Sequence, residues 1–200
     1  MCGIVGYIGR KSASGILLKG LKRLEYRGYD SAGLITAIDG IMHLRRAVGR
    51  VQELELLLAN SPAPGEMGIS HTRWATHGRP TEANAHPHLD STGRIAIVHN
   101  GIIENHATIR ALLTEKGIVF RSETDTEALA QLCGYFYAES GDFLESVRLA
   151  LQEVRGTFGI CAICVDEPRT MIAAKRGSPL LLGLGDNEFL VSSDGGAIVE

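Results

Sequence analysis

Met1-Cys2-Gly3-Ile4-Val5-Gly6-Tyr7-Ile8-Gly9 opens the chain, and the interpretation of the remaining sequence depends on this apolar run. Its β-branched residues predict a buried strand over residues 2–9. Glycines inside a strand often mark the close approach of a ligand or of another backbone. Cys2 directly follows the initiator methionine, and its small side chain permits the removal of Met1.

Removal of Met1 would leave Cys2 with both a thiol and a free α-amine. An α-amine titrates at about 7.7–8 and a thiol near ~8.5. One residue would then hold a nucleophile and a base near cellular pH, and no histidine would be needed. The competing interpretation is a small buried residue that starts an edge strand, and composition alone favours it because cysteine is usually buried.

The composition limits the classes of protein. The chain has 200 residues, 44% of them hydrophobic, which suits one domain, or one domain of a longer protein, with a full core. The net charge is -3 and Lys and Arg do not cluster, which argues against nucleic acid or an anionic membrane as a partner. We find no membrane span of roughly 18 apolar residues and no secretion signal, and expect a cytoplasmic protein.

Two pairs of metal-ligating residue types need an explanation. Cys161 and Cys164 have the spacing of a zinc knuckle or a redox pair. They lie in a predicted strand, however, where positions three apart point to opposite faces, and no second pair exists. His86 and His88 lack a third ligand at suitable spacing. We therefore expect core cysteines and loop histidines, with no metal and no cofactor.

The rest of the chain predicts an α+β fold, because runs of helix lie between hairpins. Asp39-Gly40 between two apolar runs is a strong hairpin signal, and Thr124 and Glu127 have capping-box spacing. The stretch 74–93 shows no periodicity, which is typical of a functional or disordered loop. We expect helices over 14–25, 51–59, 102–116, 124–138 and 142–154, and further strands over 34–38, 41–44, 67–72, 94–99, 157–165, 170–175, 179–184 and 188–193.

Polar groups follow the predicted strands at three places. Arg73 follows one strand, Asn100-Gly101 ends another abruptly, and Asp125 begins a helix. Singly these are a surface arginine, a turn and a helix-start carboxylate. Together they match an α-amino acid, because Arg73 offers a bidentate fork to a carboxylate and Asp125 accepts from an ammonium group. The Asn100 amide and the Gly101 N–H would form an oxyanion hole.

Blocks of sequence in a fixed order carry a resemblance to a known family. They are MCGIVG at 1–6, LEYRGYDSAG at 24–33, HTRWATHG at 71–78, NAHPH at 84–88, VHNGIIEN at 98–105, SETDTE at 122–127, RGTFG at 155–159 and GSPL at 177–180. Over essentially its whole length the chain resembles the glutaminase domains of glutamine–fructose-6-phosphate aminotransferases. These are class II glutamine amidotransferases of the N-terminal-nucleophile superfamily. Amidophosphoribosyltransferases resemble the chain less, notably at 26–30 and 74–77.

The resemblance implies a four-layer α-β-β-α sandwich with two stacked antiparallel sheets. It implies that Cys2, freed of Met1, attacks the side-chain amide carbon of glutamine, and that the resulting γ-glutamyl thioester is hydrolysed to glutamate and ammonia. The α-amine moves the proton, and Asn100 and Gly101 hold the oxyanion. The implied substrate-binding residues are Arg73 for the carboxylate, Asp125 for the ammonium, Trp74, Thr76 and His77 in a closing loop, Arg27 and Gly28 near the nucleophile, and His86.

Residues 1–200 would then be a glutaminase domain that is incomplete at its C-terminal end and lacks the sugar-isomerase domains of the family. Those domains would be its partners in a full-length homodimer that makes glucosamine-6-phosphate, whereas the fragment alone is compatible with a monomer. Two alternatives stay open. One is the glutaminase half of a related enzyme such as amidophosphoribosyltransferase, and the other is a non-catalytic glutamine-binding module in which Met1 is retained.

Overall fold

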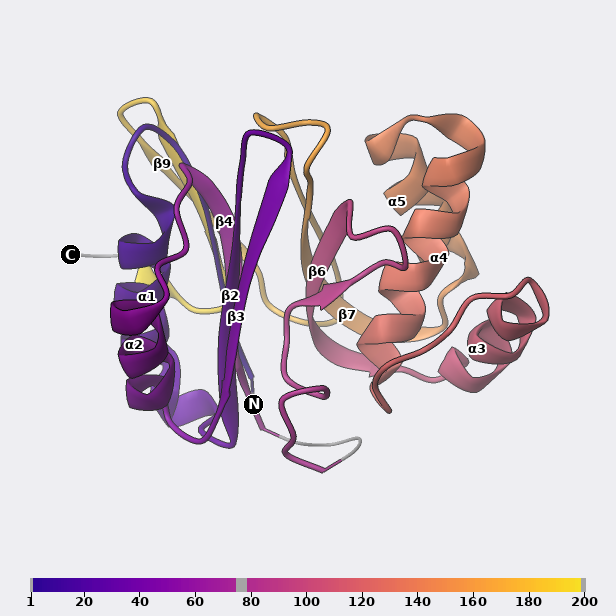
Figure 1. The fold of residues 1–200 in the computed structure, drawn as a ribbon, viewed down its shortest axis with the longest axis horizontal. Helices are drawn as coiled ribbons and strands as arrows, with labels where there is room; N and C mark the ends of the chain where they lie inside the picture. The colour runs from indigo at the N-terminus through magenta and orange to yellow at the C-terminus, as the bar shows by residue number, and fades with distance from the viewer. Residues whose placement is uncertain (1, 75–78, 199–200) are drawn as a thin grey trace.

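Two antiparallel sheets stack face to face, and helices cover the outer face of each sheet (Figure 1). The computed structural model describes residues 2–74 and 79–198. The first sheet contains β1 (Gly3–Ile8), β2 (Ser31–Ile38), β3 (Ile41–Val48), β4 (Met67–Arg73), β9 (Leu181–Gly185) and β10 (Glu188–Ser192), with helices α1 (Ala13–Leu24) and α2 (Val51–Asn60) outside it. The second contains β5 (His88–Leu89), β6 (Ile95–Ile103), β7 (Gly156–Cys164) and β8 (Met171–Arg176), covered by α3 (His106–Glu115), α4 (Asp125–Ser140) and α5 (Phe143–Glu153).

The order of the strands places the N-terminal strand near the middle of its sheet. Among the described residues, the first sheet runs β3-β2-β4-β1-β10-β9 and the second runs β5-β6-β7-β8. Short 3-10 turns follow α1 at Glu25–Arg27 and end the described chain at Gly195–Ala197. The predicted α-β-β-α sandwich is therefore confirmed. No helix in the described part of the chain is both long and apolar enough to cross a membrane.

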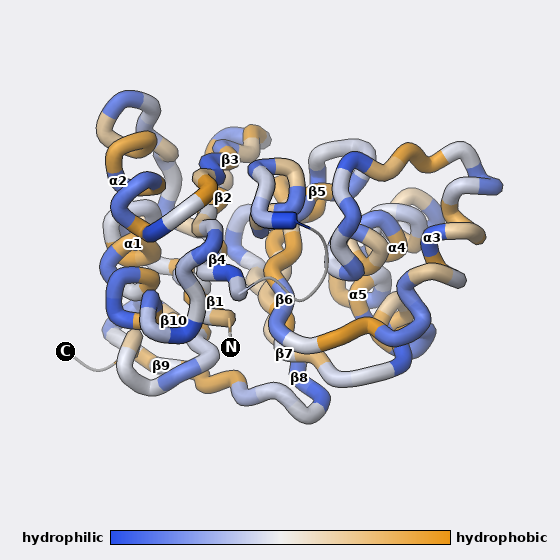
Figure 2. Tube along the Cα trace, turned by 90° about the horizontal axis from the view of Figure 1, so that it is seen from below, coloured by the Kyte–Doolittle hydropathy of each residue, from blue (hydrophilic) through white to orange (hydrophobic). Residues whose placement is uncertain are grey.

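Three apolar layers hold the sandwich together. In β1, Val5 faces the layer under α1 and α2, whereas its neighbour Ile4 faces the layer between the sheets. Successive side chains of a strand alternate in this way, so a strand buried on both faces has a continuous apolar sequence. Burying each such side chain contributes about 1.5–3 kcal/mol. Figure 2 shows the hydrophobic residues of β6 between the two helical layers.

The two cysteines of the Cys161-x-x-Cys164 pair lie on opposite faces of β7, as the period of a strand predicts. Cys161 packs in the layer between the sheets, and Cys164 packs against the helices of the second sheet. Both thiols are free and buried. Among the described residues, no group of three or more His, Cys, Asp or Glu side chains is arranged to hold a metal ion.

The prediction for residues 100–105 was wrong. Asn100-Gly101 does not end the strand, because β6 continues to Ile103 and pairs with β7 throughout, with Asn100 opposite Gly159. The helix expected from residue 102 begins only at His106. The ladder with β7 outweighs the local turn preference of Asn-Gly, and Gly101 adapts with a φ of 134°. A short strand, β5, also lies inside the expected loop 74–93.

Local signals for turns and caps were more reliable. Asp39 and Gly40 both have positive φ, at 50° and 76°, as the hairpin between β2 and β3 requires. Thr124 Oγ1 accepts a hydrogen bond from the Glu127 N–H at 3.2 Å and caps α4. The Glu127 carboxylate does not complete the reciprocal half of the box. It accepts hydrogen bonds instead from the backbone N–H groups of Arg121 and Ser122.

Two glycines in open space separate the effect of backbone conformation from that of packing. Gly141 ends α4 with a φ of 66°, Gly15 lies within α1, and a Cβ at either position would meet no atom within 4 Å. We expect Gly141→Ala to lower the free energy of unfolding by about 1 kcal/mol because of the left-handed backbone. Gly15→Ala should raise it by about 0.5–1 kcal/mol. Urea unfolding of both variants measures this, and shifts of the same sign would contradict it.

Candidate active site

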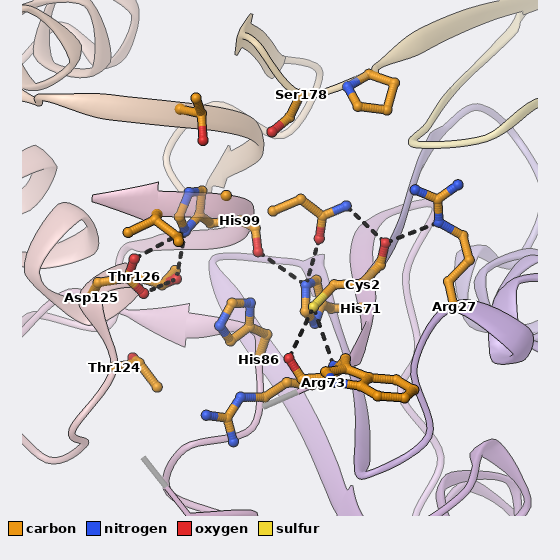
Figure 3. Close-up of a pocket in the computed structure, with 16 residues that line it drawn as sticks. Cys2, Arg27, His71, Arg73, His86, His99, Thr124, Asp125, Thr126 and Ser178 are labelled. Carbon is orange, nitrogen blue, oxygen red and sulfur yellow. Dashed lines mark hydrogen bonds and ion pairs between the residues drawn. The ribbon is translucent and has the colours of Figure 1, made fainter. Parts of the chain in front are cut away.

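A cavity of about 350 Å³ lies where β1 begins, β4 ends and β6 passes opposite them (Figure 3). It is therefore built at the junction of the two sheets. The residues that line it are Cys2, Arg27, His71, Arg73, Trp74, His86, His99, Asn100, Gly101, Ile102, Thr124, Asp125, Thr126, Thr157, Ser178 and Pro179.

The cavity brings together most of the residues that the sequence predicted for one site. Those that line it are Cys2, Arg27, Arg73, Trp74, His86, Asn100, Gly101 and Asp125. Gly28 lies behind the cavity wall, where a Cβ would meet the backbone of Arg73 at 2.7 Å and the Trp74 nitrogen at 3.0 Å. Thr76, His77 and Met1 lie outside the described residues.

The Cys2 side chain is held by the backbone of Trp74. The Cys2 Sγ accepts a hydrogen bond from the Trp74 N–H at 3.2 Å, and the thiol donates to the Trp74 carbonyl at 3.6 Å. Burial raises the pKa of the Cys2 thiol, and the bond from Trp74 opposes part of that rise. The thiol is therefore protonated at neutral pH and needs a base to become a nucleophile.

Strand β6 presents hydrogen-bond donors to Cys2. The Asn100 Nδ2 donates to the Cys2 carbonyl at 3.1 Å, which leaves its second N–H hydrogen for another acceptor. Gly101 adds a position without a side chain, and a Cβ there would clash with the Thr157 carbonyl. An amide and a backbone N–H next to a thiol are the groups that stabilise a developing oxyanion.

Opposite charges line the cavity, one from a strand and one from a helix. Arg73 ends β4 and Asp125 begins α4, and both are buried, with exposed fractions of 4% and 6%. Asp125 Oδ2 accepts from the Ile103 N–H at 2.9 Å, and Arg73 Nη1 donates to the Arg79 carbonyl at 3.3 Å. A cation and an anion on separate walls match a zwitterionic ligand.

Arg27 lies on the other side of the nucleophile (Figure 3). Its Nε donates to the Cys2 carbonyl at 3.2 Å, and its Nη1 forms an ion pair with Asp194 Oδ2 at 2.8 Å. Tyr26 also donates to this carboxylate, at 3.0 Å. Arg27 therefore ties the start of β1 to the end of the described chain, and its predicted place near the nucleophile agrees with the geometry.

Buried histidines lie in and around the site, and the sequence analysis named only His86 among them as a site residue. The His71 and His86 rings lie 4.1 Å apart between centroids, and those of His86 and His88 lie 4.8 Å apart. Burial lowers the pKa of His71 to about 3 and those of His86 and His88 well below the ordinary value. All three are neutral at physiological pH. His71 could have been found from the period of β4, because it lies two residues before Arg73 on the same face.

Comparison with protein families and curated proteins gives consistent matches. A family model described as a glutamine amidotransferase domain matches residues 71–200. The isomerizing glutamine–fructose-6-phosphate aminotransferase of Symbiobacterium thermophilum is 51% identical over 194 residues, which are 97% of this chain and 32% of that protein. The enzyme of the same name from Bacteroides thetaiotaomicron is 50% identical over 202 residues, covering 100% of this chain and 33% of that protein. The chain thus spans about a third of the length of these relatives.

Solved structures agree on the fold. The glutamine phosphoribosylpyrophosphate amidotransferase from B. subtilis, complexed with ADP and GMP, superposes with a TM-score of 0.82 at 27% identity, covering 98% of this chain and 42% of that one. A structure described as the allosteric regulatory enzyme of purine biosynthesis gives a TM-score of 0.84 at 27% identity, with the same coverage. Both are less similar in sequence than the aminotransferases, so the amidophosphoribosyltransferase alternative is not better supported.

The raised pKa of Cys2 predicts slow alkylation at neutral pH. The iodoacetamide reaction needs the thiolate, so its rate should rise with pH and reach half its maximum above the ordinary pKa of a cysteine thiol. Peptide mass spectrometry of alkylated protein measures this for Cys2, with the fully buried Cys161 as the unreactive internal control. An inflection below the ordinary value would contradict the assigned effect of burial.

Proposed function

The chain belongs to the glutamine amidotransferase domain family, and we propose that its cavity hydrolyses glutamine to glutamate and ammonia through a thioester on Cys2. One observation carries the proposal. The Cys2 thiol lies beside the Asn100 amide in a cavity whose other walls present Arg73 and Asp125. A nucleophile, an oxyanion site and the two charges that recognise an α-amino acid therefore meet in one place.

The reaction begins when the α-amine of Cys2, freed by removal of Met1, takes the thiol proton. The sulfur attacks the side-chain amide carbon of glutamine, and the carbonyl oxygen becomes an oxyanion that accepts from Asn100 Nδ2 and the Gly101 N–H. The carbon–nitrogen bond then breaks, and the protonated α-amine gives its proton to the departing nitrogen as ammonia forms. Water attacks the thioester, releases glutamate and restores the thiol.

Substrate recognition follows from the charges of the cavity. The Arg73 guanidinium pairs with the α-carboxylate of glutamine, and Asp125 accepts from its α-ammonium group. Asp125 keeps its place because the Ile103 N–H holds one carboxylate oxygen at 2.9 Å. Trp74 lines the cavity beside Cys2 and packs edge-on against Tyr29 at 5.3 Å between ring centroids. We further assign Thr76 and His77, which follow Trp74 in the chain, to the lining of the closed site.

We extend the proposal to the whole protein because its aminotransferase relatives are about three times longer than this chain. In the full-length enzyme, residues 1–200 belong to a glutaminase domain. Sugar-isomerase domains then use the released ammonia to convert fructose-6-phosphate to glucosamine-6-phosphate. The full enzyme is a cytoplasmic homodimer. A chain that retained Met1 would bind glutamine without hydrolysing it, because its nitrogen at Cys2 would be an amide.

Replacing Cys2 tests the nucleophile. We expect Cys2→Ala to lower the rate of glutamate release by about 10³-fold or more, because no other group forms the thioester. Cys133→Ala is the matched control, since that thiol is buried in α4 outside the cavity. Intact-mass measurement of the same samples establishes the fraction without Met1, and activity should follow that fraction. Glutamate release by Cys2→Ala, or by chains that retain Met1, would exclude the mechanism.

Replacing the two charged residues tests substrate recognition. Arg73→Gln and Asp125→Asn each remove one charge-assisted contact worth about 1.5–3 kcal/mol, so KM for glutamine should rise about 10- to 100-fold. Arg10→Gln, at an exposed arginine outside the cavity, should leave KM unchanged. Steady-state kinetics of the three variants measures this. An unchanged KM in either site variant would remove that residue from the proposed recognition.

A further inference from the structure

We propose that His71 is a positioning residue that holds the Asn100 side-chain amide in the one orientation that can stabilise the oxyanion. The inference rests on the proposed function, because Asn100 matters only where an oxyanion forms. It starts from an unusual property of β4, which carries a buried imidazole near the centre of the six-stranded sheet. His71 pairs with Ile4 on one side and with Gly33 on the other, and its exposed fraction is 1%.

The imidazole of His71 connects the two sheets at the nucleophile. Its Nε2 lies 3.0 Å from Asn100 Oδ1 and 3.0 Å from the His99 carbonyl oxygen, both on β6 of the second sheet. Figure 3 shows the bond that joins His71 to the backbone of His99. The ring also stacks on His86, with an interplanar angle of 30°. Its position is therefore fixed by a strand, a neighbouring ring and two hydrogen-bond partners.

The partners of Nε2 determine which nitrogen carries the proton. A backbone carbonyl can only accept, so Nε2 must donate, and it then also donates to the Asn100 oxygen. Burial keeps the ring neutral, with a pKa of about 3, so Nδ1 is bare. Consistently, Nδ1 is buried and has no hydrogen-bond partner among the described residues. The geometry thus fixes the Nε2–H tautomer.

The tautomer in turn fixes the amide of Asn100. Its oxygen faces the Nε2–H of His71, and its nitrogen donates to the Cys2 carbonyl at 3.1 Å. Turning the amide over would place two donors together at His71 and two acceptors together at Cys2. It would also present an oxygen, which repels the oxyanion, where a donor is required. Without the His71 donor, only the bond to Cys2 would oppose this reversal.

A pair of amide substitutions tests the role of the donor. The side-chain nitrogen of glutamine reaches about as far as the histidine Nε2, whereas that of asparagine ends one methylene earlier. His71→Gln therefore keeps a donor near Asn100, and His71→Asn removes it while retaining a polar side chain. Each substitution is made in the wild-type chain and in an Asn100→Ala chain, and melting temperatures are measured for all variants to separate loss of folded protein from loss of activity.

We expect His71→Asn to lower kcat for glutamine hydrolysis by about 10- to 100-fold, somewhat less than the about 10²–10³-fold cost of deleting an oxyanion donor. KM should change by less than about threefold, because the contact acts in the transition state. His71→Gln should retain most of the wild-type kcat. In the Asn100→Ala background His71→Asn should have little further effect, since its target is gone. Wild-type kcat in His71→Asn, or an equal loss in both backgrounds, would overturn the inference.

Nitrogen-15 NMR of the Cys2→Ala chain provides a readout that does not depend on turnover. The His71 ring should show the Nε2–H tautomer throughout the range from about pH 5 to 8. The Asn100 side-chain amide signals should shift in His71→Asn and return towards their wild-type positions in His71→Gln. If the Asn100 side-chain amide signals do not shift in His71→Asn, the inference would be overturned. Absence of glutamine hydrolysis by the wild-type chain would instead overturn the proposed function, and the NMR result would still decide whether His71 orients Asn100.

Discussion

The antiparallel pairing of β1 with β4 is the constraint on which the site depends. Gly3 lies opposite Thr72, so the same register continued by one residue puts Cys2 opposite Arg73. The Cys2 Sγ then meets the backbone N–H of Trp74, and the proposed nucleophile and the proposed carboxylate-binding cation come from adjacent ends of two paired strands. A slip of one residue would turn every β1 side chain to the other face of the sheet and bring side chains to the positions of Gly3 and Gly6, where a Cβ would meet atoms at 2.7 and 2.8 Å.

The layer between the sheets changes character along its length. Over most of its area it is apolar, with residues such as Ile69 of β4 and Val98 of β6, and this packing fixes the distance between the sheets. At the end near Cys2 the same two strands present His71 and Asn100, which bond to one another across the gap. Buried polar groups are costly unless they are paired, so this bond stabilises the junction as well as shaping the site.

Sequence reasoning succeeded where a signal is local and failed where it depends on pairing. Arg73 and Asp125 could be predicted because they stand at the end of a strand and at the start of a helix. Local sequence signals, such as the capping residue Thr124, indicate where these elements begin and end. Asn100 and Gly101 line the cavity as expected, but they were predicted to end their strand, since nothing nearby in sequence reveals that the ladder with β7 continues. His71 looked like one residue of a buried strand. Its role depends on the register between two sheets, which no local pattern specifies.

The electrostatics of the cavity support the base that the proposed mechanism uses. Burial raises the pKa of the Cys2 thiol, so attack needs a proton acceptor close by. The buried histidines are the obvious candidates, but burial lowers the pKa of His71 to about 3, and its Nε2 already donates to two oxygens. His86 and His88 are also poor bases, with pKa values well below the ordinary one. Because these three histidines are neutral, they place no positive charge beside Arg73. A free α-amine on Cys2 itself titrates at about 7.7–8, near the working pH, and the proposed mechanism therefore requires the removal of Met1.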